Sequence, residues 1–168
     1  MDTRRPHYLL YSHTDSRSQP GAWRVIVKKP DGSVLLEAAD TEPDVQGERL
    51  ELLAVIRGLE ALDQPARVTL ATPSRYVRRG LAYGLDEWRN NGWSWECFGR
   101  MVPIKNQDLW QRLDRALKFH DVQCRRWRID AAHPWLQRPQ REQSTASDRR
   151  QSEDDTGDGE NDAMGRQR

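Results

Sequence analysis

Apolar residues recur at helical spacing between Glu48 and Leu62, and the neighbouring segments of the chain are arranged around this stretch. At 100° per residue its apolar side chains share one arc, while arginines and glutamates fall on the other side. The apolar arc consists of Leu52, Val55, Ile56, Leu59 and Leu62. Glu51 lies at the edge of this arc, where a carboxylate is partly removed from water and needs a partner or a metal. We predict a central helix with one deeply buried face.

Short apolar runs on both sides of this helix predict β-strands. Before the helix, the run His7–Tyr11 predicts a buried strand, and two further runs flank the turn sequence P-D-G-S at Pro30–Ser33. These two runs, Trp23–Lys28 and Val34–Ala39, predict a hairpin, so the first three strands form an antiparallel meander. After the helix, Arg67–Ala71 predicts an inner strand that pairs in parallel with the first strand.

The segments after the fourth strand alternate between helical patterns and turns. Ser74–Tyr83 has helical spacing, and Asn90–Gly92 is a turn. Asn106–Leu117 predicts an amphipathic helix with Asn106 at its capping position. Gln123–Ile129 predicts the last strand. The predicted fold is therefore α/β, with a mixed five-stranded sheet flanked by helices.

Apolar residues are concentrated in the first part of the chain. They make up 36% of the 168 residues, against 32% charged residues, and hardly any lies beyond Gln137. A segment without apolar side chains cannot bury itself. We therefore expect a polar leader over residues 1–6, one domain over residues 7–140 and a disordered charged tail over residues 141–168.

Charge and cysteine content narrow the class of protein only slightly. The net charge is +1, but Arg75–Lys105 carries six basic against three acidic residues. Cys97 and Cys124 lack the paired spacing of a disulfide or a zinc site. The sequence shows neither a signal peptide nor an apolar run of membrane-spanning length. We expect a cytoplasmic, monomeric protein that does not enter membranes.

Four motifs resemble ribonuclease H of type 1. They are R-L-E-L-L-A-V-I-R-G-L-E-A-L, V-T-L-A-T-P-S-R-Y-V-R-R-G-L, W-R-N-N-G-W and V-P-I-K-N-Q-D-L-W-Q-R-L-D-R-A-L. The resemblance extends from about His7 to Gln140. It implies a ribonuclease H-like fold and cleavage of the RNA strand of RNA–DNA hybrids. It also implies two Mg²⁺ ions, held by four carboxylates, that orient water and stabilise the leaving oxygen.

Two of the family's first three carboxylate positions carry other residues in this chain. Glu51, in R-L-E-L, matches the helix carboxylate. After the fourth strand the family has T-D-S, whereas this chain has Thr72-Pro73-Ser74, and proline offers no oxygen. On the first strand the metal position falls on Ser12 or His13, and a shifted alignment places Asp15 there.

The C-terminal part of the resemblance also departs from the family. The family segment G-H-A-G-H-P-E-N corresponds to I-D-A-A-H-P-W-L, so Asp130 replaces a histidine, and the last carboxylate falls at Gln140. Glu51 is therefore the clear candidate for a catalytic and metal-binding residue, with Asp15 and Asp130 as substitute ligands. We expect Mg²⁺ to bind weakly or not at all.

The family's substrate-binding positions are better preserved than its metal ligands. Basic side chains neutralise phosphates, and aromatic rings pack on sugars or bases. The positions expected to contact nucleic acid are Ser74, Arg75, Trp88, Arg89, Trp93, Arg100 and Lys105. These residues correspond to a basic protrusion of the family, and an alternative is that the tryptophans pack this protrusion onto the sheet.

Three functions are compatible with these residues. The first is a catalytically impaired ribonuclease H-like domain that binds RNA–DNA hybrid or double-stranded RNA through shape and 2′-hydroxyl contacts. The second is an active ribonuclease H, and the third is a protein-interaction domain that kept only the fold. Pro73 at a ligand position favours the first and third over the second.

Overall fold

The computed structural model describes residues 4–17 and 19–126. The predicted domain end near residue 140 and the tail over 141–168 lie outside the described residues, as do Asp130 and Gln140. These predictions therefore stay predictions.

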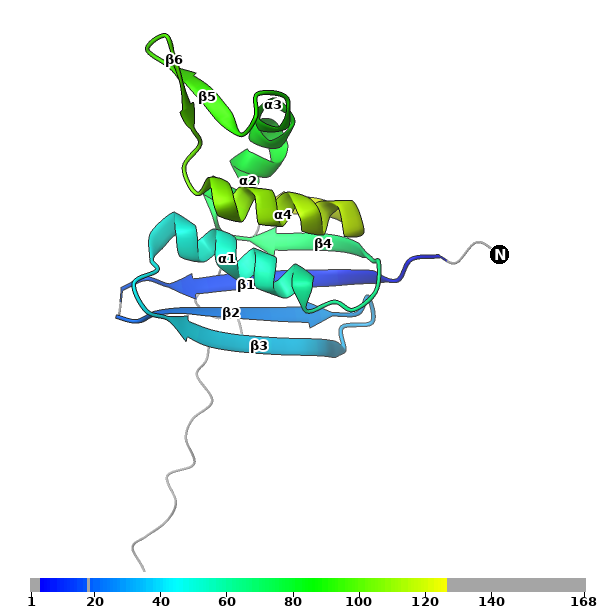
Figure 1. Ribbon diagram of the computed structural model, residues 1–168. Coiled ribbons are helices and arrows are strands. Elements are labelled where there is room, and N and C mark those ends of the chain that lie inside the picture. The colour runs from blue at the N-terminus through cyan, green and yellow to red at the C-terminus, as the bar shows by residue number, and fades with distance from the viewer. Residues whose placement is uncertain (1–3, 18, 127–168) are drawn as a thin grey trace, which may run out of the picture. The chain divides into compact units, whose positions relative to one another are not determined.

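A five-stranded mixed sheet forms the centre of the domain, as predicted (Figure 1). In the order in which they lie in the sheet, its strands are β3 (Val34–Glu42), β2 (Gly21–Lys28), β1 (His7–Asp15), β4 (Arg67–Thr72) and β7 (Asp121–Arg126). The first three pair antiparallel, while β4 pairs in parallel with both β1 and β7. The predicted meander and the parallel return are both confirmed.

Helices cover one face of this sheet. In chain order they are α1 (Gly47–Glu60), α2 (Arg75–Arg79), the π-helical turn η1 (Gly80–Gly84), α3 (Leu85–Asn90) and α4 (Gln107–Phe119). Helices α1 and α4 pack against each other over the sheet (Figure 1). The predicted apolar arc of α1 is buried, and Leu52, Val55, Ile56 and Leu59 are all inaccessible to solvent. Burial of this arc supplies the main hydrophobic stabilisation of the helix.

Trp110 of α4 lies at the centre of the core and sets how closely the helices approach. Its side chain is fully buried. A Cβ atom added to Gly80 would lie 2.0 Å from the Trp110 ring, so only glycine allows the chain at η1 to pass over the indole. The continuous helical pattern predicted over Ser74–Tyr83 is thus interrupted by a π-turn at this contact.

Besides the π-turn, the structure differs from the sequence prediction in strand β1, in a second hairpin and at the start of α4. Strand β1 continues beyond Tyr11 to Asp15, because its polar end pairs with β2. Two exposed strands, β5 (Ser94–Cys97) and β6 (Arg100–Pro103), form a separate hairpin that the sequence did not predict. Asn106 precedes α4 as predicted, but its backbone is left-handed and its side chain does not cap the helix.

Two observations concern the described helices and the cysteines. None of the described helices combines the length and the apolar character needed to cross a membrane. Cys97 and Cys124 are free thiols.

Candidate active site and nucleic-acid interface

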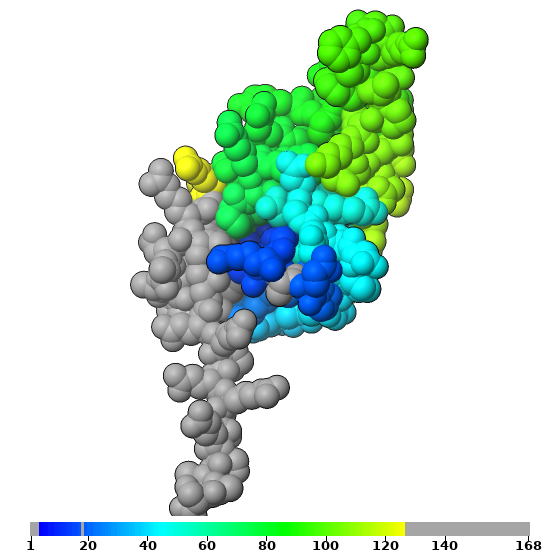
Figure 2. Space-filling view, turned by 90° about the vertical axis from the view of Figure 1, so that its left-hand side faces the viewer, coloured from blue at the N-terminus to red at the C-terminus, as the bar shows by residue number. Residues whose placement is uncertain are grey.

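Strands β1 and β4 run in parallel and end at the same edge of the sheet, where α1 begins; Figure 2 looks onto this edge. In sheets of this kind, ligands bind beyond the carboxyl ends of the parallel strands. The polar residues at this edge are Ser12 on β1, Glu51 on α1, Thr72 at the end of β4, and Ser74 directly after it.

Glu51 is half-buried, and its carboxylate has a hydrogen-bond partner. The Ser74 hydroxyl donates a hydrogen bond of 2.5 Å to Glu51 Oε2 and accepts one of 3.1 Å from the Val77 backbone N–H. Ser74 is only 4% exposed and is the N-cap residue of α2. One serine therefore links the carboxylate to the start of α2. The predicted need for a polar partner is confirmed.

The structure decides which residue of β1 faces the helices. Leu10 lies against α1, where a Cβ atom on Gly58 would come within 2.8 Å of its side chain. Side chains alternate along a strand, so Ser12 shares this face and His13 does not. Ser12 is 2% exposed and follows the registered pair Tyr11–Ala71 by one residue, which brings it beside Thr72. The β1 position of the family's metal site therefore holds a serine hydroxyl.

Asp15 is not brought to Glu51. By the same alternation its side chain points to the sheet face opposite Ser12. Its carboxylate accepts a hydrogen bond of 2.9 Å from the Arg17 backbone N–H. With His13 it lines a different hollow, of about 400 Å³, over β2 and β3. Burial lowers the pKa of His13, and Asp15 opposes that shift.

The donor set at this edge does not fit a pair of Mg²⁺ ions. Among the residues that the structure describes, no three His, Cys, Asp or Glu side chains lie close enough together to hold a metal. Glu51 offers the carboxylate, Ser12, Thr72 and Ser74 offer neutral hydroxyls, and Pro73 offers nothing. Two adjacent dications need several anionic oxygens to offset their mutual repulsion.

Two of the basic residues expected to contact nucleic acid, Lys105 and Arg89, form ion pairs with acidic residues of the domain. Lys105 Nζ lies 2.7 Å from Glu48, whose hydrogen bond raises the pKa of Lys105. The Arg89 guanidinium donates to Asp114, a carboxylate of α4 that is 6% exposed, and also pairs with Asp86. Arg89 thus joins α3 to α4, a contact within the fold that the sequence did not suggest.

The tryptophans pack against the domain. The Trp88 ring meets Trp110 edge-on, with centroids 4.9 Å apart, and a Cβ atom on Gly84 would lie 2.5 Å from the Trp88 indole. Trp93 is half-buried against the same core. These contacts agree with the packing interpretation of the two rings. Arg75 and Arg100 are exposed, and their contact with nucleic acid stays a prediction.

Two further features of this region escaped the sequence analysis. The Tyr76 hydroxyl donates a hydrogen bond of 3.1 Å to the Lys105 carbonyl and accepts one of 2.7 Å from the Trp110 indole N–H. Arg78 and Arg79 extend the basic surface of Arg75 along α2. The spacing of these arginines, three and four residues apart on a helix, was a signal that could have indicated a shared face.

The sheet order and the helices that cover it define an α/β domain of the ribonuclease H type, and comparison with known proteins agrees. The model of the RNase H family matches residues 9–138, and the chain belongs to this family. Ribonuclease H of Halorhodospira halophila is 43% identical over 114 residues, covering 68% of this chain and 73% of that protein. Ribonuclease H of Rhodopseudomonas palustris is 42% identical over 125 residues, covering 72% and 76%.

Solved structures show the same fold. LC9-RNase H1, a type 1 RNase H with the type 2 active-site motif, superposes with a TM-score of 0.63 at 26% identity, covering 79% of this chain and 68% of that one. LC11-RNase H1 in complex with RNA/DNA hybrid gives a TM-score of 0.54 at 14% identity, covering 71% and 84%. The predicted family and fold are confirmed.

Proposed function

We propose that this chain is a hybrid-binding member of the ribonuclease H family whose carboxylate set does not sustain two-metal cleavage. Family membership over residues 9–138 supports the substrate class, since LC11-RNase H1 and the foamy viral protease-reverse transcriptase share the fold and are both solved with RNA/DNA hybrid. Pro73, in place of a carboxylate between two buried hydroxyl residues, is the single observation that carries the loss of cleavage.

The edge carries one carboxylate among hydroxyl groups. The Glu51 carboxylate is engaged by Ser74, and the neighbouring hydroxyls of Ser12 and Thr72 are buried. We propose that the exposed guanidinium groups of Arg75 and Arg100 bind the backbone of the duplex, while the edge, whose hydroxyls are buried, does not cleave it.

Hydrolysis of the RNA strand is the second candidate. The observation that favours it is the identity of 36–43% to relatives that carry the name ribonuclease H. In that case Mg²⁺ would be held by Glu51 together with groups outside the described residues, of which Asp130 is the substitute ligand that the resemblance suggests.

Gel retardation tests the proposed binding. The full chain is titrated against labelled RNA–DNA hybrid, double-stranded RNA and double-stranded DNA of one sequence, without divalent metal. Retardation of the hybrid at lower protein concentration than the DNA duplex is the expected result, because recognition rests on shape and 2′-hydroxyls. Equal retardation of all three would show electrostatic binding without preference for the hybrid and contradict the proposed substrate, while absent retardation would favour the protein-interaction alternative.

A further inference from the structure

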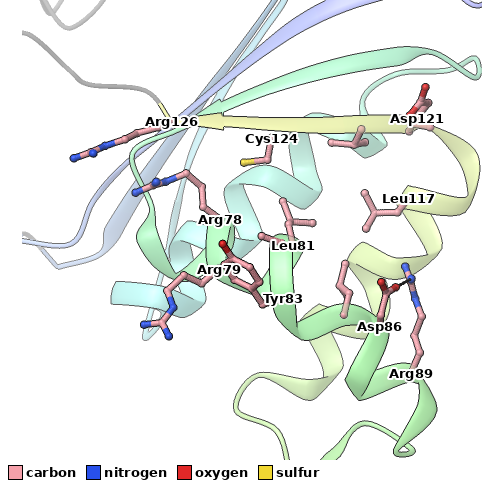
Figure 3. A pocket seen from close by; sticks show the side chains of 14 residues that line it. Arg78, Arg79, Leu81, Tyr83, Asp86, Arg89, Leu117, Asp121, Cys124 and Arg126 are labelled. Atoms are coloured by element: carbon pink, nitrogen blue, oxygen red, sulfur yellow. Dashed lines mark hydrogen bonds and ion pairs between the residues drawn. The ribbon is translucent and has the colours of Figure 1, made fainter.

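Four arginines line one hollow between helix α2 and the end of strand β7. The hollow has a volume of about 470 Å³ and is lined by Arg75, Arg78, Arg79, Tyr83 and Arg126. Three of its arginines come from α2, while Arg126 comes from a strand far away in the sequence. Figure 3 shows Arg78, Arg79 and Arg126 directed toward the same open side. We call these five residues the arginine groove.

The positive charge of the arginine groove is not neutralised by the described part of the domain. None of its four arginines forms an ion pair with a described residue. The Arg78 Nε–H is buried and has no hydrogen-bond partner among them. Among the acids that line the two adjoining hollows, Asp86 pairs with Arg89, Asp121 with Arg67 and Glu48 with Lys105, while Glu87 forms no ion pair with a described residue. Such a concentration of unpaired guanidinium groups calls for an anion.

The arginine groove continues toward the proposed hybrid site. A second hollow, of about 580 Å³, shares Arg75, Arg79 and Tyr83 with it and extends to Glu48 and Trp88. Glu48 lies in the first turn of α1, the helix that carries Glu51, and Ser74 precedes Arg75 directly. An extended ligand can therefore run from the candidate edge, past Tyr83, to the end of β7.

We propose that the arginine groove binds a single nucleic-acid strand that extends from the hybrid. Guanidinium groups match phosphate oxygens in bidentate geometry, so four of them suit a phosphodiester backbone. The Tyr83 ring is 80% exposed and offers a face for stacking. Only an unpaired base can use such a face, because bases within a duplex are already stacked. The aromatic ring is what favours a strand over an acidic peptide.

Two double variants test this inference, which rests on the proposed function only for the location of the hybrid. R79A/R126A removes two exposed arginines of the groove. R115A/R125A is the matched control. It also removes two positive charges at exposed positions, one on a helix (α4) and one on a strand (β7). Arg125 neighbours Arg126 on β7, and its side chain points to the opposite sheet face.

Each protein is titrated against a blunt RNA–DNA hybrid, against the same hybrid with a single-stranded DNA extension of about ten nucleotides at either end, and against the isolated DNA strand. We expect an extension to tighten binding of the wild type and to steepen its salt dependence. R79A/R126A should lose this gain and about 1.4 units of salt slope, two contacts at about 0.7 each for a single strand. R115A/R125A should keep both.

The outcomes separate the two proposals. An extension that brings no gain in the wild type, or a gain that survives equally in both variants, would overturn the arginine groove as a strand site. If the wild type ignores the blunt hybrid but binds the isolated DNA strand through Arg79 and Arg126, the groove stands and the hybrid-binding proposal fails.

Discussion

At the scale of single residues, the family pattern located Glu51 and the structure supplied its partner. The sequence marked Glu51 because a carboxylate at the edge of a buried arc needs compensation. It could not identify Ser74 as that compensation, since the contact joins residues 23 positions apart. The choice between Ser12 and His13 likewise required the strand's facing, which a polar stretch without apolar alternation does not reveal.

The Glu51–Ser74 contact predicts the effect of removing the charge. Glu51→Gln keeps an oxygen that can accept from the Ser74 hydroxyl, so the free energy of unfolding should change by no more than about 1 kcal/mol. Urea unfolding measures this change. Glu51→Leu is the contrasting variant, because it leaves the Ser74 hydroxyl without its acceptor in a buried site. A loss of several kcal/mol in Glu51→Gln would show that the carboxylate is needed for folding.

His120 makes the stability of the domain depend on pH. The side chain is 3% exposed, burial lowers its pKa, and the Ala66 backbone N–H donates to Nδ1 at 3.3 Å, which requires that nitrogen to be unprotonated. As the pH falls below about 6.5, His120 becomes protonated in the unfolded chain while it stays neutral in the folded chain. The unfolded state then binds more protons, so the free energy of unfolding decreases. Above that pH both states are neutral and His120 contributes no slope.

Urea unfolding at about pH 7.5 and about pH 5.5 measures this dependence. Wild type should be less stable at the lower pH, and His120→Asn should reduce the difference. A pH dependence of the same size in both proteins would assign it to other groups.

At the scale of elements, the buried segments were predictable and the exposed ones were not. Helices α1 and α4 and the five strands of the main sheet show apolar periodicity because one face of each is buried or half-buried. Hairpin β5–β6 buries little, with Phe98 fully exposed between its strands, and so leaves no such pattern. The π-turn at Gly80 follows from the packing of Trp110, a tertiary contact.

The sequence predicts contact with nucleic acid for both Arg89 and Arg100. We expect their replacement by alanine to affect stability and binding differently. Arg89→Ala removes the main partner of buried Asp114, and we expect a loss of about 3 kcal/mol in unfolding free energy with Lys118 left as a weaker neighbour at 3.3 Å. Arg100→Ala, at an exposed position of β6, should leave stability unchanged and weaken hybrid binding. Thermal unfolding and gel retardation of both variants separate the roles. Equal effects on stability would mean that Arg89 is not a structural residue.

At the scale of the whole molecule, the domain combines a preserved framework with an altered reactive edge. The sheet order, the helix pair and the family match over residues 9–138 are those of a ribonuclease H. At the edge where β1 and β4 end, serine and proline stand where the family pattern has carboxylates. Basic residues lie on α2 and at the end of β7, where we propose that a nucleic-acid strand binds.

The central claim is that this edge binds hybrid without cleaving it, and a cleavage time course measures that directly. Labelled RNA–DNA hybrid is incubated with wild type or Glu51→Gln in Mg²⁺ and in Mn²⁺, with Halorhodospira halophila ribonuclease H as the reference, and retardation is followed in parallel. We predict that both proteins retard the hybrid and that wild type releases no more RNA fragment than Glu51→Gln. Steady metal-dependent cleavage by wild type that Glu51→Gln abolishes would contradict the claim and establish the second candidate function.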